Sequence, residues 1–548
     1  MGFFVSGKLS VFAPVQPRSA YKPRWLTEVL YEPYGNAVPW SPRTTWVPRP
    51  SLPVPTMIEA RYRFLAIIVL LGSSSVGLAQ DKPTDDEVSF YRQVRPILQR
   101  RCSGCHSPAK KGGDLILTSF EELLIGGEAG AGFVAGKPDD SVLMEYISGE
   151  DPEMPRNDAP LSPAQIGTIS RWIEQGAKND TPESVRDTIS AENPPVYTAA
   201  PVVTALAYSP DSKLIATSGY REILIHKTDG TGLVSRLIGR SQRIESIAFS
   251  PDGKLIGAAC GTPALFGEVQ IWNVAEKKLV RSITLSHDTL FGGSFSDDGK
   301  LFGFGVADNS ARVINVADGK EITRLDTHSD WVLDTTFSLK NDHLISVSRD
   351  RSTKLTIVES GQFVDNVTSI TPGALKGGLM AVQRHPKKEQ LLVGGADGQP
   401  RLYKIFRTRK RVIGDDFNHI RAYEKMRGRI FDMQFSSDGK MFVVGASDAT
   451  TGAAYIYETG EFNEATINNA GGLGEVRNQI NARSAKPAVK HKLPGITGPV
   501  FAVAFRPDGK QVVVGGFDGT LRFYDVASGK AAKQLVPVKI VQSVAKTR

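Results

Sequence analysis

A short pattern of apolar and polar residues recurs through the central and C-terminal parts of the chain. Each copy begins with two apolar residues separated by one residue of any type. A polar turn close to Ser-Pro-Asp-Gly-Lys follows, and then a run rich in β-branched and aromatic residues. Clear copies of the turn centre on Asp211, Asp252, Asp298, Asp438 and Asp508, and weaker copies lie at 337–342 and 385–388. Such runs on either side of an Asp-Gly turn are typical of antiparallel hairpins, so the pattern predicts a series of small sheets.

The spacing of the turns predicts how many sheets there are. The marker positions 211, 252, 298, 342, 388, 438 and 508 are 41, 46, 44, 46, 50 and 70 residues apart. A repeat in the forties is typical of a four-stranded propeller blade, so seven markers predict seven blades. The units resemble WD repeats, and Ile271-Trp272-Asn273 comes closest to the Trp-Asp ending. The resemblance implies an all-β WD-repeat propeller over 199–545 and indicates the fold rather than the function.

A period close to that of an α-helix governs residues 84–180. Thr84-Asp-Asp-Glu87 has the form of a capping box that opens a helix, and Pro96 bends this helix or restarts it. A second helix is expected at 141–148, and a third after a Ser-Pro cap at 162–176. The sequence therefore predicts a multidomain protein, with a small all-α domain ahead of the propeller.

The candidate chemistry of the helical region lies in Cys102-Ser-Gly-Cys105-His106. Two thiols at this spacing can each form a thioether to haem, and the adjacent histidine is then an axial ligand of the iron. A redox disulfide would not need the histidine. A zinc site would need a second pair of ligands nearby, whereas the next candidates are Cys260 and His226. The motif predicts one haem c, attached through Cys102 and Cys105 and ligated by His106.

The second axial ligand has to come from another residue type. No histidine other than His106 precedes His226, so a second histidine from this domain is excluded. Met144 lies in an apolar helical stretch and fits a core position, whereas Met154 lies in an irregular segment ahead of the last helix. Because Met/His ligation is the usual pair in cytochromes c, Met154 is the predicted ligand. Ligation by Met144 and an open sixth position are the alternatives.

These motifs, in their order along the chain, resemble the planctomycete-type cytochrome c domain. The matching segments are Val94–Leu98, Cys102–His106, Gly136–Pro138, Met154-Pro155, Leu161-Ser162 and Trp172–Ala177. The resemblance implies that the Cys-x-x-Cys-His motif binds haem and that the methionine of the Met-Pro pair is an axial ligand. Those roles fall on Cys102, Cys105, His106 and Met154. The family usually has Met-Pro-Pro, whereas Arg156 follows Pro155 here.

A secretory signal is expected at 57–79. Arg61 and Arg63 precede the apolar run at 64–71, and Gly77-Leu-Ala79 has the form of a cleavage site. The apolar run is too short to cross a bilayer comfortably, so no stable membrane span is expected after cleavage. Export also suits the chemistry, because bacterial haem c is attached outside the cytoplasm. The expected location is therefore the periplasm or another exported compartment.

Two further segments carry no expected globular structure. Residues 1–56 hold ten of the 33 prolines and no apolar periodicity. We expect a disordered extension, or one that is not translated, with Met57 as the initiator. Residues 181–198 are polar, contain Pro194-Pro195, and are the expected linker between the two domains.

The charge distribution bears on the partners of the protein. The formal net charge is +8, of which residues 1–80 contribute +5, residues 81–180 contribute −6 and residues 181–548 contribute +9. No basic run with interleaved aromatic residues accompanies the positive charge, so a nucleic-acid partner is not expected. A hydrophobic content of 41% is ordinary for a soluble globular protein, and Cys260 in its apolar run is expected to be a small core residue.

Several polar residues of the propeller are expected to be structural. The repeated aspartates should accept hydrogen bonds from the turns. His287 and His328 lie just before inner strands, where WD repeats place a structural histidine, and this role is favoured over metal ligation because no ligand spacing accompanies them. Two insertions, at about 406–425 and 459–490, are expected to be solvated loops, although loops on a rigid scaffold also contact partners.

These features lead to one main functional hypothesis. The protein is expected to be an exported mono-haem cytochrome that transfers single electrons, with the propeller as a docking scaffold for a redox protein or complex. A non-enzymatic role is favoured, because no other catalytic motif can be identified. The alternatives are a redox enzyme with its active site in the propeller channel and a haem-based sensor or scaffold.

Overall fold

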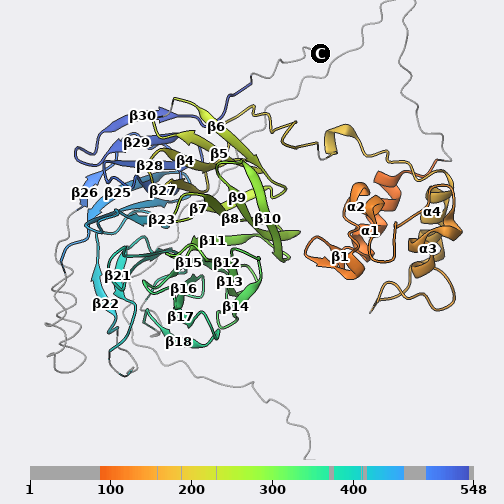
Figure 1. The fold of residues 1–548 in the computed structure, drawn as a ribbon, viewed down its shortest axis with the longest axis horizontal. Coiled ribbons are helices and arrows are strands. Elements are labelled where there is room, and N and C mark those ends of the chain that lie inside the picture. Colours follow the sequence, from red (N-terminus) through yellow and green to blue (C-terminus); the bar gives the residue numbers. More distant parts are fainter. Residues whose placement is uncertain are drawn as a thin grey trace, which may run out of the picture. The chain divides into compact units, whose positions relative to one another are not determined.

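The computed structural model describes residues 87–156, 158–186, 188–229, 231–369, 375–408, 410, 416–461 and 489–541. The expected extension at 1–56, the expected signal at 57–79 and most of the insertion at 459–490 lie outside these residues, as do 409 and 411–415 of the other insertion. The chain forms a helical domain followed by a β-propeller (Figure 1), as predicted. Among the described helices, none is long and apolar enough to cross a membrane.

The helical domain consists of short helices around a single core. Its helices are a π-helical turn at Phe90–Val94, α1 at Arg95–Arg101, α2 at Phe120–Ile125, α3 at Val142–Ile147 and α4 at Pro163–Glu174. Two short strands, β1 at His106–Ser107 and β2 at Lys110–Lys111, pair antiparallel. Single 3-10 turns lie at Gly112–Asp114, Pro138–Asp140 and Glu183–Val185.

The caps explain where the predicted helices begin. Ser162 and Gln165 form a reciprocal capping box ahead of α4, and Pro163 is its first residue, as predicted. Among the described residues, the first helical turn begins at Phe90 and is capped by the Ser89 side chain. Most of the expected Thr84–Glu87 box lies outside the described residues. Pro96 stands in the first turn of α1, where its missing N–H costs nothing, so the helix restarts there.

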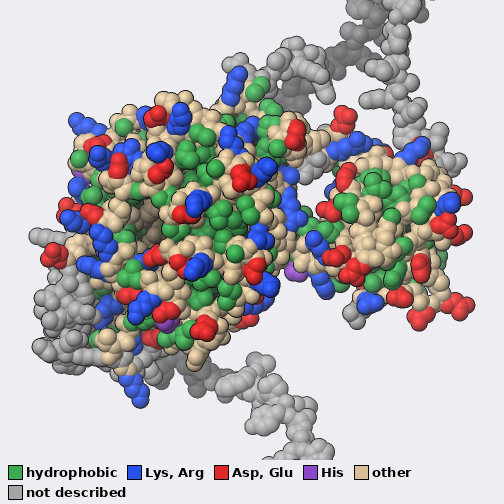
Figure 2. All heavy atoms as spheres, in the orientation of Figure 1, with side chains coloured by type: hydrophobic (Ala, Val, Ile, Leu, Met, Phe, Trp, Pro, Cys, Tyr) green, Lys and Arg blue, Asp and Glu red, His purple; other side chains and the backbone are tan. Residues whose placement is uncertain are grey.

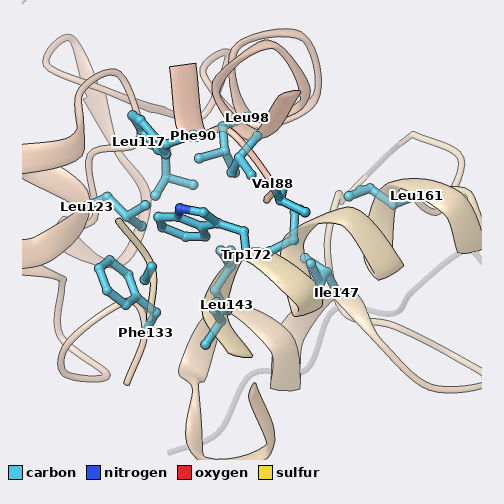
Figure 3. Packing of buried hydrophobic residues seen from close by; sticks show 14 residues of the cluster. Val88, Phe90, Leu98, Leu117, Leu123, Phe133, Leu143, Ile147, Leu161 and Trp172 are labelled. Carbon is cyan, nitrogen blue, oxygen red and sulfur yellow. The ribbon is translucent and has the colours of Figure 1, made fainter. Parts of the chain in front are cut away.

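Trp172 lies at the centre of the helical core (Figure 3). Its side chain is 1% exposed, and its ring centroid lies 5.3 Å from that of Phe90, 6.2 Å from Phe120 and 5.1 Å from Phe133. The indole N–H donates to the Lys178 carbonyl at 3.0 Å, so burial leaves no unpaired donor. One side chain of α4 thereby joins the first helical turn, α2 and the loop before α3.

The propeller consists of seven antiparallel four-stranded sheets, as predicted, and each sheet is built from four consecutive strands. The first blade is β3–β6 (Leu206–Tyr208, Leu214–Ser218, Glu222–Lys227, Leu233–Ile238), and the second is β7–β10 (Arg243–Phe249, Leu255–Thr262, Phe266–Asn273, Lys278–Ser286). The third is β11–β14 (Leu290–Phe295, Leu301–Val306, Ala311–Asn315, Glu321–Leu325), and the fourth is β15–β18 (Val332–Phe337, His343–Ser348, Thr353–Ile357, Phe363–Asn366). The last three are β19–β22 (Leu379–Arg384, Gln390–Gly395, Arg401–Lys404, His419–Ala422), β23–β26 (Arg429–Phe435, Met441–Ser447, Gly452–Glu458, Val489–Lys492) and β27–β30 (Val500–Phe505, Gln511–Gly516, Leu521–Asp525, Ala531–Leu535).

A hydrophobic cluster lies between every pair of neighbouring blades, including the last and the first. The innermost strands contact one another in order, and β27 contacts β3, which closes the ring. Outside the last blade, Tyr197 bridges Ile540 in parallel, and its hydroxyl donates to the buried Glu222 at 2.6 Å. The ring is therefore closed by apolar packing and by pairing between the two ends of the propeller segment.

Polar side chains connect some of the inner strands. Ser246, Asp334 and Asp432 each accept a backbone N–H from the inner strand of the next blade. The donors are Gly293 at 2.7 Å, Val382 at 2.8 Å and Val503 at 2.8 Å, respectively. These bonds lie next to bulges, where the inner strands have register shifts and leave N–H groups free of the ladder.

Candidate haem-binding site

The Cys-x-x-Cys-His motif forms a helical turn directly after α1. The N–H of Cys102 donates to the Leu98 carbonyl at 2.9 Å, and the N–H of His106 donates to the Cys102 carbonyl at 2.9 Å. The N–H of Cys105 also donates to the Cys102 carbonyl, at 3.1 Å. Residues three and four positions apart lie on one side of a helical turn, so the two thiols and the imidazole leave the backbone on a common side.

The two cysteines have different surroundings. Cys102 is partly buried and packs against the core cluster of Trp172, and burial raises the pKa of its thiol to about 11 although the nearby Arg101 charge acts in the opposite direction. Cys105 is exposed, and the Lys110 ammonium lies 3.4 Å from its sulfur. Both thiols are free, as attachment to a porphyrin requires.

His106 is held through its backbone and packs closely against a glycine. Its carbonyl accepts the N–H of Leu117 at 2.9 Å, and β1 pairs it with Lys111. A Cβ atom at Gly112 would lie 3.2 Å from the ring carbon Cε1 and 3.2 Å from the Cys105 carbonyl. The ring nitrogen Nδ1 is buried and has no hydrogen-bond partner within the described part of the chain.

Met154 lies in the loop between α3 and α4. Its N–H donates to the Tyr146 carbonyl at 2.9 Å, and its partly buried side chain packs against the same core cluster as Cys102. The Arg101 guanidinium lies 3.4 Å from the Asp158 carboxylate and also donates to the Ala159 carbonyl. The end of α1, directly before the cysteine motif, is therefore joined to the loop that carries Met154.

Cys102 and Met154 pack against one core cluster, His106 and Cys105 follow Cys102 in the same turn, and the chemistry of the four groups fits haem c. Two free thiols, an imidazole and a thioether are the groups that hold this cofactor. The glycine beside the His106 ring leaves room that any side chain would fill. Met144 is also partly buried against the same cluster, as its predicted core position requires, so the choice between the two methionines remains a prediction.

Comparison with protein families supports the division into two domains. A family model described as Planctomycete cytochrome C matches residues 102–158, and a model described as WD domain, G-beta repeat matches residues 319–355 and 488–525. The chain joins a planctomycete-type cytochrome c domain to a WD-repeat propeller. The cytochrome match begins at Cys102 and includes Met154, so all four predicted haem-binding residues lie within it.

Curated proteins resemble the chain at low identity. It is 27% identical over 109 residues to the WD repeat-containing protein 91 homolog of Dictyostelium discoideum, which is 20% of this chain and 14% of that protein. It is 24% identical over 234 residues to the U3 small nucleolar RNA-associated protein 15 homolog of Xenopus tropicalis, 36% of this chain and 43% of that protein. Eukaryotic translation initiation factor 3 subunit I of Xenopus tropicalis is 22% identical over 322 residues, 53% of this chain and 94% of that protein. The first two matches span less than half of the relatives' own length.

The propeller histidines differ from each other in environment. His328 is buried, with Nδ1 at 2.9 Å from the Asp350 carboxylate and Nε2 at 2.9 Å from the Ser346 hydroxyl. Burial lowers the pKa of His328, so the expected structural role is confirmed there. The side chain of His287, by contrast, is exposed, so the structural role stays a prediction there.

The turn aspartates and Cys260 behave as predicted. The Asp252 carboxylate accepts the Lys254 N–H at 3.1 Å and the Ser250 hydroxyl at 2.6 Å, and Asp211, Asp298 and Asp438 repeat this arrangement. Cys260 is fully buried between the first two blades, which raises the pKa of its thiol. The expectation of a solvated loop was wrong for the second half of the first insertion, where His419–Ala422 forms β22 and Phe417, Ile420 and Tyr423 are buried, because this half completes the fifth blade. Residues 462–488 of the second insertion lie outside the described residues.

Sequence reasoning missed three features of the molecule. It did not foresee the Lys110 contact with Cys105, which depends on the β1–β2 hairpin, or the Arg101 bridge to the loop of Met154, which depends on how distant segments pack. Nor did it find the acidic pair on the inner strands. Burial raises the pKa of Asp334 to about 8, where the charge of Asp432 adds to the effect, and it raises the pKa of Asp432 to about 7.

Proposed function

We propose that the cytochrome domain binds one haem c and transfers single electrons. Cys102 and Cys105 would form the two thioethers, and His106 and Met154 would be the axial ligands. The bound haem would supply one-electron chemistry through the Fe(III) and Fe(II) states. A thioether ligand favours the reduced state, so Met154 would raise the reduction potential relative to a second histidine.

One observation carries this proposal most directly. The backbone of residues 98–106 presents two free thiols and the imidazole from a single helical turn, and the Met154 loop is tied to the same helix through Arg101. The remaining residues of the domain would act by shaping the environment. The cluster around Trp172 would exclude water from one side of the site and hold Cys102 in place, while exposed Cys105 would mark the side that faces solvent.

We further propose that the propeller docks a protein partner. WD propellers are rigid scaffolds on which loops can form contact surfaces. Two of the relatives are named for a small nucleolar RNA and for translation. We nevertheless propose a protein partner, because the positive charge of this chain is scattered and no basic, aromatic-rich run accompanies it.

Export is part of the proposal. Residues 57–79 would direct the chain to the compartment where haem c is attached, and cleavage after Ala79 would remove them. Intact mass and N-terminal sequencing of the protein from its natural host test this. A mature chain that begins at Gln80 supports the proposal, whereas a retained segment before Met57 contradicts it.

The absorption spectrum of the haem-loaded protein tests the electron-transfer proposal. Wild type should be six-coordinate and low-spin in both oxidation states, with the weak far-red band of a methionine–iron bond. Met154→Ala should lose that band. Met144→Ala is the matched control, because this methionine packs against the same cluster, and it should keep the band.

Other outcomes of this test separate the alternatives. Loss of the band in Met144→Ala alone would move the ligand assignment to Met144. A high-spin spectrum that neither substitution changes would indicate an open sixth position and favour a haem-based sensor or enzyme. Absence of covalently bound haem after expression with a haem-attachment system would overturn the proposal altogether.

A further inference from the structure

Charge is divided unevenly within the cytochrome domain. Residues 88–113, which include the haem motif, carry six basic side chains and no acidic one. Residues 114–180 carry four basic and thirteen acidic side chains. The haem-motif segment is therefore +6 within a domain that is otherwise strongly negative, and Figure 2 shows acidic side chains spread over the visible face of this domain.

The two groups of basic residues also differ in their ion pairs. Outside the haem-motif segment, three of the four basic residues, Lys137, Arg156 and Lys178, have a carboxylate partner within 3.8 Å, and Arg171 has none among the described residues. Within the segment, Arg101 alone has one, Asp158. Among the described residues, no carboxylate lies within 4.0 Å of the charged groups of the other five, which are Arg92, Arg95, Arg100, Lys110 and Lys111.

Two of these unpaired lysines lie directly beside the haem-binding residues. Lys110 and Lys111 are exposed and form β2, which pairs with β1, so that Lys111 lies across from His106 and Lys110 across from Ser107. The Lys110 ammonium lies 3.4 Å from the sulfur of Cys105, the exposed thiol of the pair. The first carboxylate after them, that of Asp114, belongs to an exposed residue outside the hairpin. The solvent-facing side of the motif is therefore positively charged.

We infer that the hairpin of Lys110 and Lys111 forms a positively charged docking surface at the haem-binding site and that the redox partner presents an acidic surface to it. The inference rests on the proposed haem function. Unpaired charges near an exposed reactive edge act on encounter, because they attract a partner of opposite charge before contact and orient it. The acidic remainder of the domain repels the same partner, which strengthens the orientation. An exposed pair of this kind raises the association rate more than it raises the final affinity.

Small inorganic oxidants of opposite charge test the inference without knowledge of the natural partner. The reduced, haem-loaded full chain gives one electron to hexacyanoferrate(III), a trianion, or to tris(phenanthroline)cobalt(III), a trication. In each reaction the haem iron is oxidised and the metal of the probe is reduced by one electron. Stopped-flow rates are measured at low and high ionic strength for wild type and for Lys110→Glu/Lys111→Glu.

The expected result is a change of opposite sign for the two probes. In the double variant, the hexacyanoferrate rate at low ionic strength should fall about tenfold and the cobalt rate should rise, because steering changes rates by roughly 10- to 1000-fold. High salt should remove most of the difference, since the screening length falls to about 3 Å at 1 M. Lys110→Gln/Lys111→Gln should lie between wild type and the reversed variant.

A control with the same change in net charge separates local from global effects. Lys137→Glu/Arg171→Glu alters the charge equally at exposed positions outside the haem-motif segment and should change the hexacyanoferrate rate less than twofold. Equal effects in both variants, or none in either, would overturn the inference. Haem content is measured first: a protein without haem c would defeat the proposed function, whereas a haem-loaded protein with unchanged rates would defeat the docking surface alone.

Discussion

The helical domain and the propeller distribute their buried surface differently. The helical domain has one cluster, with Trp172 in contact with three other aromatic rings. The propeller has a separate cluster between every two neighbouring blades, so that no single side chain touches more than a small part of its core. The candidate haem site lies in the domain with the concentrated core, and the proposed docking scaffold is the domain with the divided one.

This difference has a physical consequence for the two regions. In a single small core, the residues that support the site and the residues that stabilise the fold are the same. Cys102 and Met154 both pack against the cluster that contains Trp172. In a ring of blades, a loop can change with little effect on the hydrophobic clusters between other blades. The following predictions are ordered from the largest expected effect to the smallest.

Truncation of Trp172 should have the largest effect and should affect the helical domain but not the propeller. Trp172→Ala should destabilise the helical domain by about 3–5 kcal/mol, because it removes a fully buried aromatic side chain. Calorimetry should then show the propeller transition alone, and haem attachment should fail. Phe302→Ala, which truncates a buried ring between the second and third blades, should lower the propeller transition and leave the haem spectrum intact. Loss of both transitions in Trp172→Ala would mean that the domains do not fold independently.

The two buried carboxyl groups on the inner strands should make the propeller less stable as the pH rises to mildly alkaline values. The folded-state pKa values of Asp334 and Asp432, about 8 and about 7, lie above the unfolded value of about 4. Their contribution to folding is therefore complete below about pH 4 and is lost as the pH rises through 7 to 8. Each carboxyl should account for about 1–3 kcal/mol of this loss.

Thermal unfolding between pH 5 and 9 measures this effect. The propeller transition should fall across the range in wild type, and it should fall less in Asp334→Asn/Asp432→Asn, which keeps an acceptor oxygen but cannot ionise. The transition of the cytochrome domain should respond equally in both proteins. An unchanged slope for the propeller of the double variant would contradict the assignment.

Replacement of Arg101 tests whether its bridge from α1 positions the loop that carries Met154. Arg101→Ala removes the bonds from α1 to Asp158 and Ala159, at a cost of about 1 kcal/mol, and should raise the fraction of high-spin haem. Arg156→Ala is the matched control. Its guanidinium is more exposed and lies 3.8 Å from the Glu153 carboxylate, so its loss should change the spectrum little. A larger effect from Arg156 would show that the bridge does not position the loop.

A single added methyl group at Gly112 should have the smallest effect. Its Cβ would lie 3.2 Å from the His106 ring, so the ring must move by a few tenths of an ångström. Gly112→Ala should fold and bind haem, with a shift of the low-spin electron paramagnetic resonance signals and a stability loss below about 1 kcal/mol. Gly104→Ala is the control, because nothing lies within 4 Å of its Cβ. Identical spectra for both variants would argue against close packing of the ring in the loaded protein.

Much of the fold could be predicted, and the reason differs between the two regions. In the propeller, each Asp-Gly turn is a local event, and its repetition at a regular interval predicted seven blades. In the helical domain, the Ser162 cap and the position of Pro96 predicted helix boundaries because caps depend on neighbouring residues. Position within a repeat did not predict that His328 is buried and His287 is exposed, because burial depends on what covers each loop.

By itself, the sequence determined those properties that depend on residues close together in the chain. The spacing of Cys102, Cys105 and His106 predicts a haem-attachment motif, because side chains three and four residues apart lie on one side of a helical turn. Only the tertiary structure decided the contacts between distant segments. Packing partly buries Cys102 against the core of Trp172, joins Arg101 to the loop of Met154, and closes the propeller between β27 and β3. These contacts depend on the balance of burial and chain entropy over the whole domain, which no local pattern records.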